Sequence, residues 1–219
     1  MINKNKFKVS VIITVFNRKK IFLRAINSLL LQTYKNFETI IVDDGSTDGF
    51  ENIIFPILKK CSNFKYIRHS NRHTALSLNT GLKIAGGEYI TFLDSDDEYK
   101  KEHLEKRVKY LEKNKNIDIL YSNAELIGTE ENMYVPDARN KNKLIHLNNC
   151  IIGATFFGKK KVFDELIGFK NVYSYDSEFF RRAIEYYNVV KFEMPTYKYY
   201  RDSKDSVLTK LKSKISDKK

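Results

Sequence analysis

The sequence predicts an α/β fold built on a mostly parallel sheet flanked by helices, and two observations support this prediction. Segments with the continuous apolar character of buried parallel strands alternate with segments whose apolar residues recur at helical spacing. The alternation continues over residues 8–100 of a chain of 219 residues. A strand, helix, strand rhythm implies right-handed crossovers and a parallel sheet, whose ligands bind beyond the carboxyl ends of the strands.

The first half of the chain has the most regular elements. Residues 8–15 (KVSVIITV) form the first expected strand, and Asn17 is a candidate N-cap for the helix that follows. The apolar residues at helical spacing in that helix are Ile21, Phe22, Ala25, Ile26, Leu29 and Leu30. Further strands are expected at 37–42, 64–67 and 88–93, and further helices at 49–60 and 75–85.

The pattern is looser beyond residue 100. Helices are expected at 101–114 and 176–187, and strands at 117–127, 151–157, 189–192 and 197–200. Residues 129–147 are polar and irregular, and we expect them to form a loop or hairpin over the ligand cleft. Because no repeat or low-complexity linker interrupts the chain, we predict a single domain over 1–219, with two lobes and a basic tail over 201–219.

Composition excludes several classes of protein. Hydrophobic residues make up 42% of the chain and aromatic residues 13%, which is enough for a core and excludes global disorder. No apolar run approaches the roughly eighteen residues of a membrane-spanning helix, and the polar N-terminus predicts no secretory signal peptide. Cys61 and Cys150 have no metal-ligand spacing, so neither a zinc site nor a disulfide framework is expected. A cytoplasmic location fits best.

The chain is strongly basic. Its 39 basic and 27 acidic residues give a net charge of +12, which favours anionic partners such as nucleic acid, a nucleotide or phospholipid headgroups without choosing among them. In the tail, one helical face carries Val207, Leu208, Leu211 and Ile215, with lysines around it. This pattern fits either a helix lying on anionic lipid at the inner face of the membrane or a solvated basic tail.

The segment Asp94-Ser95-Asp96-Asp97 follows the predicted strand 88–93. Alternate side chains of an extended segment point the same way, so Asp94 and Asp96 can face one ligand. Clustered carboxylates repel one another unless a cation neutralises them or some take up protons. Mg²⁺ or Mn²⁺ is typically held by one or two carboxylates together with substrate phosphates. The alternative is a solvated acidic turn that caps the next helix.

A second acidic segment, 42–48 (VDDGSTD), follows the preceding strand of the predicted sheet. Its Asp44 can accept a hydrogen bond from a nucleobase imide, and the alternative is a turn in which Ser46 or Thr47 caps a helix. Thr14, Asp44 and Asp94 all lie at the carboxyl ends of predicted strands. We therefore expect these three side chains to converge on one edge of the sheet.

Three segments in this order resemble the family 2 glycosyltransferases with the GT-A fold. They are 9–17 (VSVIITVFN), 42–48 (VDDGSTD) and 87–97 (GEYITFLDSDD). The resemblance covers most of residues 8–100 and resumes at 166–207. It implies a GT-A-type domain with a nucleotide-sugar-binding half at about 8–100 and an acceptor-binding half at about 101–200. It also implies transfer of a sugar with inversion at its anomeric carbon.

The family's site residues carry over to matching positions. Thr14 and Asp44 match positions that meet the uracil of a UDP-sugar. Asp94 matches the first carboxylate of the family's DxD motif, near ribose or metal, and Asp96 matches the last. The latter holds the Mn²⁺ or Mg²⁺ that bridges the donor diphosphate. The candidate nucleotide-sugar-binding residues are therefore Thr14, Asp44, Arg72, Asp94 and Ser95, and the candidate metal ligands are Asp94 and Asp96.

Asp176 matches the family's catalytic base. It opens a predicted helix, whose macrodipole favours an ionised carboxylate, while neighbouring Glu178 is expected to raise its pKa. Such a base takes the proton of an acceptor hydroxyl as that oxygen attacks the anomeric carbon, which becomes oxocarbenium-like. A bound cation neutralises the leaving diphosphate.

The sequence departs from the family pattern in four places. Tyr175 stands where a glutamate usually precedes the base, and Leu78 replaces a frequent arginine. Residues 71–74 replace a glycine-rich loop, and Ser203 occupies the histidine position of the YRxHxxS segment. The QxxRW signature of processive synthases is absent, which predicts transfer of one sugar per encounter.

The expected function is therefore transfer of a sugar from UDP to a hydroxyl of a glycan or lipid-linked acceptor, in bacterial cell-surface polysaccharide synthesis. No nucleic-acid partner is expected. One alternative is a nucleotidyltransferase, which would be expected to have a glycine-rich loop after its first strand, whereas residues 16–19 contain no glycine. The other is a basic nucleic-acid-binding module, in which carboxylates at the ligand edge would repel phosphates unless a metal were bound.

Overall fold

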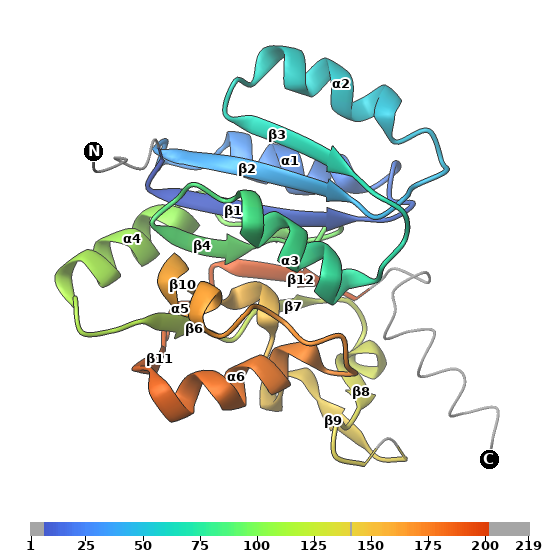
Figure 1. The fold of residues 1–219 in the computed structure, drawn as a ribbon. Coiled ribbons are helices and arrows are strands. Elements are labelled where there is room, and N and C mark those ends of the chain that lie inside the picture. The colour runs from blue at the N-terminus through green and yellow to red at the C-terminus, as the bar shows by residue number, and fades with distance from the viewer. Residues whose placement is uncertain (1–6, 141, 202–219) are drawn as a thin grey trace.

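The computed structural model describes residues 7–140 and 142–201 of the chain (Figure 1). Its centre is a seven-stranded sheet in the order β11-β6-β10-β4-β1-β2-β3, in which β10 is antiparallel to its neighbours and the other pairs are parallel. The strands are β1 (Val9–Val15), β2 (Phe37–Asp43), β3 (Phe64–Arg68), β4 (Tyr89–Phe92), β6 (Ile119–Tyr121), β10 (Phe157–Lys159) and β11 (Val189–Lys191). The predicted mostly parallel sheet is confirmed.

Helices cover both faces of this sheet (Figure 1). Because side chains alternate along a strand, β1 buries Val9, Val11 and Ile13 in one core cluster and Ile12 in the other. Helices α1, α2 and α4 contribute to the first cluster, and α3, α5 and α6 to the second. Their bounds are α1 (Phe22–Leu30), α2 (Glu51–Lys60), α3 (Thr74–Ile84), α4 (His103–Lys113), α5 (Lys160–Glu165) and α6 (Tyr175–Tyr186).

A second sheet of three strands, in the order β5-β12-β7, continues from the acidic segment 94–97. Its strands are β5 (Glu98–Tyr99), β7 (Glu125–Ile127) and β12 (Tyr197–Tyr200). The expected hairpin over 129–147 is confirmed as β8 (Tyr134–Pro136) and β9 (Leu144–His146). The 3-10 turns η1 (Glu130–Met133) and η2 (Leu147–Asn149) flank it in the chain, and η3 (Gly153–Thr155) lies against β4 and β6.

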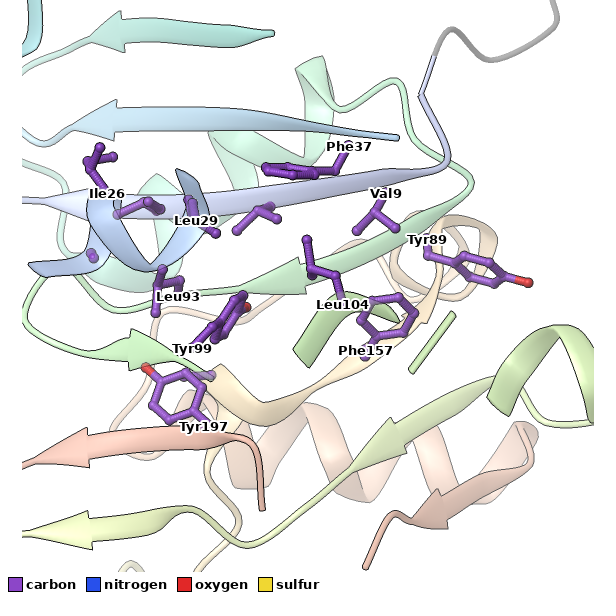
Figure 2. Packing of buried hydrophobic residues seen from close by; sticks show 14 of the residues in the cluster. Val9, Ile26, Leu29, Phe37, Tyr89, Leu93, Tyr99, Leu104, Phe157 and Tyr197 are labelled. Carbon is purple, nitrogen blue, oxygen red and sulfur yellow. The ribbon is translucent and has the colours of Figure 1, made fainter. Parts of the chain in front are cut away.

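Aromatic side chains of the smaller sheet pack against the end of β4. Figure 2 shows the rings of Tyr99 and Tyr197 near Leu93, and their centroids lie 5.7 Å apart in an edge-to-face arrangement. Tyr99 also stacks on His103, with centroids 3.5 Å apart. The Tyr99 hydroxyl donates a hydrogen bond to the carbonyl of Phe92, the last residue of β4. The end of β4 is therefore fixed against the smaller sheet.

The strand predicted at 117–127 is wrong as a single element, because it divides into β6 and β7 in different sheets. Between them the amide of Ser122 donates to the hydroxyl of Thr155, and the hydroxyl of Ser122 accepts a bond from buried Arg107. Side chains thus satisfy polar groups that a continuous strand would pair with a neighbouring strand. Burial lowers the pKa of Arg107 to about 10.

The strand predicted at 151–157 is also wrong. This segment contains the turn η3, and only its last residue, Phe157, belongs to a strand. The hydroxyl of Thr155 donates to the carbonyl of Ile152 at 2.8 Å, which closes the turn locally. The short helix α5 follows β10 and was not predicted.

Asn17 does not cap the first helix. The helix begins at Phe22, and Asn17 adopts a left-handed conformation with φ 53°. Its side-chain oxygen accepts the amide of Thr47 at 2.8 Å, and its own amide donates to the hydroxyl of Ser46 at 3.0 Å. Likewise α2 is preceded by Phe50, so neither Ser46 nor Thr47 caps it. These polar residues instead join the loops that follow β1 and β2.

Within residues 7–140 and 142–201, no helix is long and apolar enough to cross a membrane. The basic tail, expected to be either an interfacial helix or a solvated segment, lies outside the described residues from position 202 onward, and so does Ser203.

Ile167 is expected to destabilise the fold. Its φ of 58° is unfavourable for a β-branched residue. Its side chain is 88% exposed, so burial does not compensate for this cost. Asparagine tolerates this left-handed conformation, so Ile167→Asn should raise the free energy of unfolding by about 1 kcal/mol. Urea denaturation measures the change. Ile184→Asn, at an exposed position on α6, is the control and should give no gain. Equal stability of Ile167→Asn and the natural chain would contradict the prediction.

Candidate functional site

The predicted site residues of the first half meet at one edge of the sheet. Strand β1 lies between β2 and β4, and all three run parallel. Thr14 is the penultimate residue of β1, Asp44 directly follows β2, and Asp94 follows β4. The expected convergence of Thr14, Asp44 and Asp94 on the carboxyl edge is therefore confirmed.

The acidic segment after β4 is a turn and not the extended segment that the sequence suggested. The amide of Asp97 donates to the carbonyl of Asp94 at 3.1 Å, and Ser95 is buried within the turn. The turn also does not cap the next helix, which begins at His103. Asp94 nevertheless lies within reach of the charge of Asp96.

The carboxyl groups of this edge carry raised pKa values. Burial and the nearby charges of Asp96 and Asp176 raise the pKa of Asp94 to about 7. Burial also raises the pKa of Asp96, whose side chain is 18% exposed, although nearby arginines oppose the shift. The fold thus brings Asp176, from the start of α6, to the carboxylates that follow β4.

This donor set fits a hard divalent cation. Among the described residues, the charges that shift the pKa of Asp94 are those of Asp96 and Asp176, and a divalent cation would relieve their repulsion. Within the described residues, no group of three or more His, Cys, Asp or Glu side chains could hold a metal ion by itself. Asp94 and Asp96 therefore offer a partial set of oxygen ligands, which phosphate oxygens of a substrate can complete.

The Asp97 carboxylate has a structural role at this edge of the sheet. Its buried carboxylate accepts hydrogen bonds from the Tyr197 hydroxyl at 2.7 Å and from the Tyr200 amide at 2.8 Å. Burial and the charges of Asp94 and Asp96 raise its pKa well above the ordinary value. Asp97 therefore ties the acidic turn to β12, a role that its place in the motif did not indicate.

Asp44 holds the loop that follows β3. Its buried carboxylate accepts the backbone amides of Arg72 at 2.7 Å and His73 at 3.0 Å. His69 Nδ1 lies 3.3 Å from the same carboxylate. Arg72 thus contacts Asp44 through its backbone, while its side chain is exposed. Sequence reasoning missed His69, although its position directly after a strand of the sheet could have indicated it.

Asp176 is the second residue of α6, and its carboxylate is held from three sides. It accepts the Ser177 amide at 2.8 Å, the Ser174 hydroxyl at 3.1 Å and the Gly153 amide at 3.2 Å. A Cβ atom at Gly153 would lie 2.7 Å from the Asp176 Cβ, so the close approach of η3 requires glycine. Ser174 has φ 54°, a strained conformation of the kind that occurs at functional sites.

Burial raises the pKa of Asp176, and the expectation that Glu178 causes this shift is wrong. Glu178 forms ion pairs with Arg182 at 2.8 Å and Lys170 at 2.9 Å, and these lower its own pKa. Its charge is therefore neutralised locally. Of the two carboxylates at the start of α6, Asp176 alone is placed against the acidic edge.

Tyrosine rings surround the carboxylates. Tyr175, which stands at the family's glutamate position, packs edge-to-face on Phe169 with centroids 5.5 Å apart. Burial, together with the charges of Asp94 and Asp176, raises the pKa of Tyr175 well above its ordinary value. Tyr199 of β12 has a raised pKa for similar reasons. The edge is therefore both acidic and aromatic, although the site residues predicted from the sequence include no aromatic residue.

Three arginines at this edge were also missed. Arg18 Nε lies 3.9 Å from Asp96 Oδ2, and Arg24 donates to the backbone carbonyl of Asp96 at 2.9 Å. The charges of both, and of Arg201, lower the pKa of Asp96 against the effect of burial. Arg18 directly follows the segment 9–17, and Arg201 is the arginine of the YRxHxxS segment, so their positions could have indicated both.

An open cavity of about 320 Å³ lies in the second half of the chain, beside η1 and β9. The residues that line it are Ala124, Leu126, Gly128, Glu130, Met133, His146 and Asn148. The hairpin segment that was expected over the cleft thus borders this cavity.

The raised pKa of Asp94 predicts how stability depends on pH. Its pKa is about 7 in the fold against an ordinary value of 3.8, so the folded chain retains a proton that the unfolded chain has lost. The resulting stabilisation is complete below about pH 4 and is lost as the pH rises through 7. Between pH 5 and 7, we expect the free energy of unfolding to fall by on the order of 1 kcal/mol per pH unit.

Denaturant titrations in the presence of a chelator measure this slope. Asp94→Asn should flatten it, whereas Asp164→Asn, at a half-exposed carboxylate of α5, should leave it unchanged. An unaltered slope in Asp94→Asn would contradict the assignment.

Sequence comparison identifies the family. The family model for glycosyl transferase family 2 matches residues 10–208. A glycosyltransferase of Rickettsia prowazekii is 34% identical over 196 residues, which cover 82% of this chain and 61% of that protein. A glycosyltransferase of Rickettsia conorii is 46% identical over 110 residues, covering 50% of this chain but 18% of that protein. The glycosyltransferase GlyA of Streptococcus pneumoniae is 30% identical over 166 residues. The chain thus spans between about a fifth and three fifths of these relatives' lengths.

Solved structures confirm the GT-A-type fold. The TarS fragment 1–349 of Staphylococcus aureus, in complex with UDP, superposes with a TM-score of 0.71 at 24% identity, over 89% of this chain and 60% of that one. The mannosyltransferase PcManGT of Pyrobaculum calidifontis, in complex with GDP-Man and Mn²⁺, gives 0.70 at 18% identity over 91% and 58%. At these identities the likeness concerns the fold. With the family-model match over most of its length, the chain belongs to glycosyl transferase family 2.

Proposed function

We propose that this chain transfers a sugar from a UDP-sugar to a hydroxyl group of a glycan or lipid-linked acceptor, with inversion at the anomeric carbon. The convergence of Asp94, Asp96 and Asp176 from the two halves of the chain carries the proposal. The UDP-bound and UDP-GlcNAc-bound structures of TarS support a uridine nucleotide as the donor. The family assignment argues against the nucleotidyltransferase and the nucleic-acid-binding module.

Asp94 and Asp96 would hold a divalent cation, Mn²⁺ or Mg²⁺, together with the donor diphosphate. PcManGT, which was solved with Mn²⁺, supports a metal of this kind. Such a cation supplies charge that stabilises the leaving diphosphate. Asp94 and Asp96 are suited to hold this cation because both are largely buried and the charge of Asp96 acts on Asp94, so a cation would relieve their repulsion. Thr14, Asp44, Arg72 and Ser95 lie at or near the same edge and would contact the nucleotide.

Asp176 would act as the general base. The Ser177, Ser174 and Gly153 donors fix the orientation of its carboxylate, so that it can accept a proton without reorganising. Burial raises its pKa and thereby its affinity for the acceptor's proton. The attacking oxygen then approaches the anomeric carbon from the side opposite the diphosphate, which gives inversion.

We place this activity in the synthesis of bacterial cell-surface polysaccharide, at the cytoplasmic face of the membrane. The bacterial glycosyltransferases among the relatives support this setting. The basic composition of the tail 201–219 supports peripheral contact with anionic lipid.

Asp96 provides a test of the metal site. Asp96→Ala should abolish the Mn²⁺-dependent part of UDP binding, because the cation loses a carboxylate ligand while the fold is retained. Calorimetric titration with UDP, in Mn²⁺ and in EDTA, measures this part, and circular dichroism checks the fold. Asp164→Ala, which removes a carboxylate from α5, should bind UDP as the natural chain does. UDP affinity that is the same with and without EDTA in the natural chain would refute the metal assignment.

Asp176 provides a test of the base. Asp176→Asn keeps the size of the side chain but removes the basic lone pair, so the rate of UDP release from a panel of UDP-sugars with acceptor should fall by on the order of 10²–10⁴-fold. UDP and Mn²⁺ should still bind. Glu178→Gln makes the same chemical change two residues later, where the carboxylate is paired with Arg182, and should retain its rate. Near-normal turnover of Asp176→Asn would remove Asp176 from this role.

A further inference from the structure

Three guanidinium groups from separate parts of the chain surround the turn that contains Asp96. Arg18 comes from the loop after β1, Arg24 from α1, and Arg201 follows β12. All three favour the ionised form of the Asp96 carboxylate. An acidic edge enclosed by arginines can bind a cation and an anion side by side, as a metal-bound diphosphate requires.

Two of the three arginines are held by backbone carbonyls. Arg24 Nη1 donates to the carbonyl of Asp96 at 2.9 Å, and its guanidinium lies 3.7 Å from the centre of the Tyr200 ring. Arg201 is buried, and its Nε donates to the carbonyl of Asn132 at 3.0 Å. These contacts fix the positions of the turn and the end of β12.

Arg18 faces the Asp96 carboxylate itself. Its Nε lies 3.9 Å from Asp96 Oδ2, which is longer than the roughly 2.7–2.9 Å of a charge-assisted hydrogen bond. Each of the two side chains is only 18% exposed, so the charges interact with little screening by solvent. The two charges therefore interact strongly, although Nε and Oδ2 do not form a direct hydrogen bond.

The backbone of Arg18 is fixed although its side chain faces the site. Its carbonyl accepts the amides of Ile21 and Phe22, at 3.1 and 3.0 Å, at the start of α1. The preceding residue, Asn17, is bonded to the loop after β2. A change in the contacts of the guanidinium therefore requires rotation of the side chain alone, and the main chain keeps its place.

A divalent cation on the Asp96 carboxylate and the Arg18 guanidinium would repel each other and compete for the same oxygen. Phosphate oxygens offer the guanidinium an equivalent partner, because its planar fork matches phosphate geometry. We propose that Arg18 exchanges Asp96 for the donor diphosphate when the metal and the nucleotide bind together. Arg18 thus opposes binding of the cation alone and favours binding of the nucleotide, which makes the two events cooperative. This inference rests on the proposed function.

The test measures the two affinities separately in the natural chain and in Arg18→Gln. Mn²⁺ binding without nucleotide is followed by the electron paramagnetic resonance signal of the free ion, and UDP binding in saturating Mn²⁺ by calorimetry. In Arg18→Gln, we expect Mn²⁺ alone to bind several-fold more tightly, about 3- to 10-fold, because a competing charge is gone. UDP should bind about tenfold more weakly, because a charged hydrogen bond to phosphate is lost.

The opposite signs separate this role from a structural one, since damage to the site would weaken both affinities. Uridine, which has no phosphate, should bind the natural chain and Arg18→Gln equally. Arg139→Gln removes the same charge from an exposed position between β8 and β9 and should change neither affinity. If Arg18→Gln does not fold, Arg18→Lys is used, and it should shift both affinities in the same directions by smaller factors.

Two results overturn the inference and identify which part fails. If the natural chain binds UDP and Mn²⁺ but Arg18→Gln leaves both affinities unchanged or weakens both, Arg18 has no exchanging role and the proposed function stands. If the natural chain binds neither UDP nor Mn²⁺, the proposed function fails and this inference fails with it.

Discussion

The repulsion among buried carboxyl groups at one edge of the sheet is the constraint on which the rest of the structure depends. Asp94, Asp96, Asp97 and Asp176 lie within a low-dielectric environment, where their pKa values are raised. Such a cluster costs stability, so the fold holds it by contacts that do not neutralise it fully. The Tyr197 hydroxyl orients the Asp97 carboxylate and the Gly153 amide that of Asp176, while three arginines stand beside Asp96. The negative charge that remains at this edge can bind a cation.

Hydrogen bonds between loops give this edge its rigidity. Asn17 joins the loop after β1 to the loop after β2, and Asp44 joins the loop after β2 to the one after β3. Asp176 joins α6 to η3 through the Gly153 amide. Asn17, His73 and Ser174 all have positive φ angles, and each lies at one of these junctions. Local strain thus accompanies the placement of the functional groups, and the surrounding sheet compensates for it.

The sequence was sufficient to predict the first four parallel strands and the edge of the sheet at which Thr14, Asp44 and Asp94 lie. Continuous apolar runs and the acidic segments after two strands carry that information locally. The second half was less predictable, because its strands are only two to four residues long and its turns are closed by side chains such as Thr155. Arg24 lies on an amphipathic helix, and no local pattern shows that its guanidinium reaches the backbone of Asp96. The effect of Glu178 on Asp176 was misjudged, although Arg182, four residues later on the same helix, could have indicated that Glu178 is paired; its other partner, Lys170, comes from the segment before α6.

The attachment of Asp97 to β12 has a consequence for synthesis on the ribosome. Strands β1 to β4 and the acidic turn are complete by about residue 100, and domains begin to fold from their N-terminal parts as the chain emerges. The Tyr197 hydroxyl and the Tyr200 amide, which satisfy the Asp97 carboxylate, emerge almost a hundred residues later. During that interval the Asp97 carboxylate lacks the two hydrogen-bond donors that β12 supplies in the folded chain. The N-terminal half of the protein therefore reaches its final form only when the last described strand is translated.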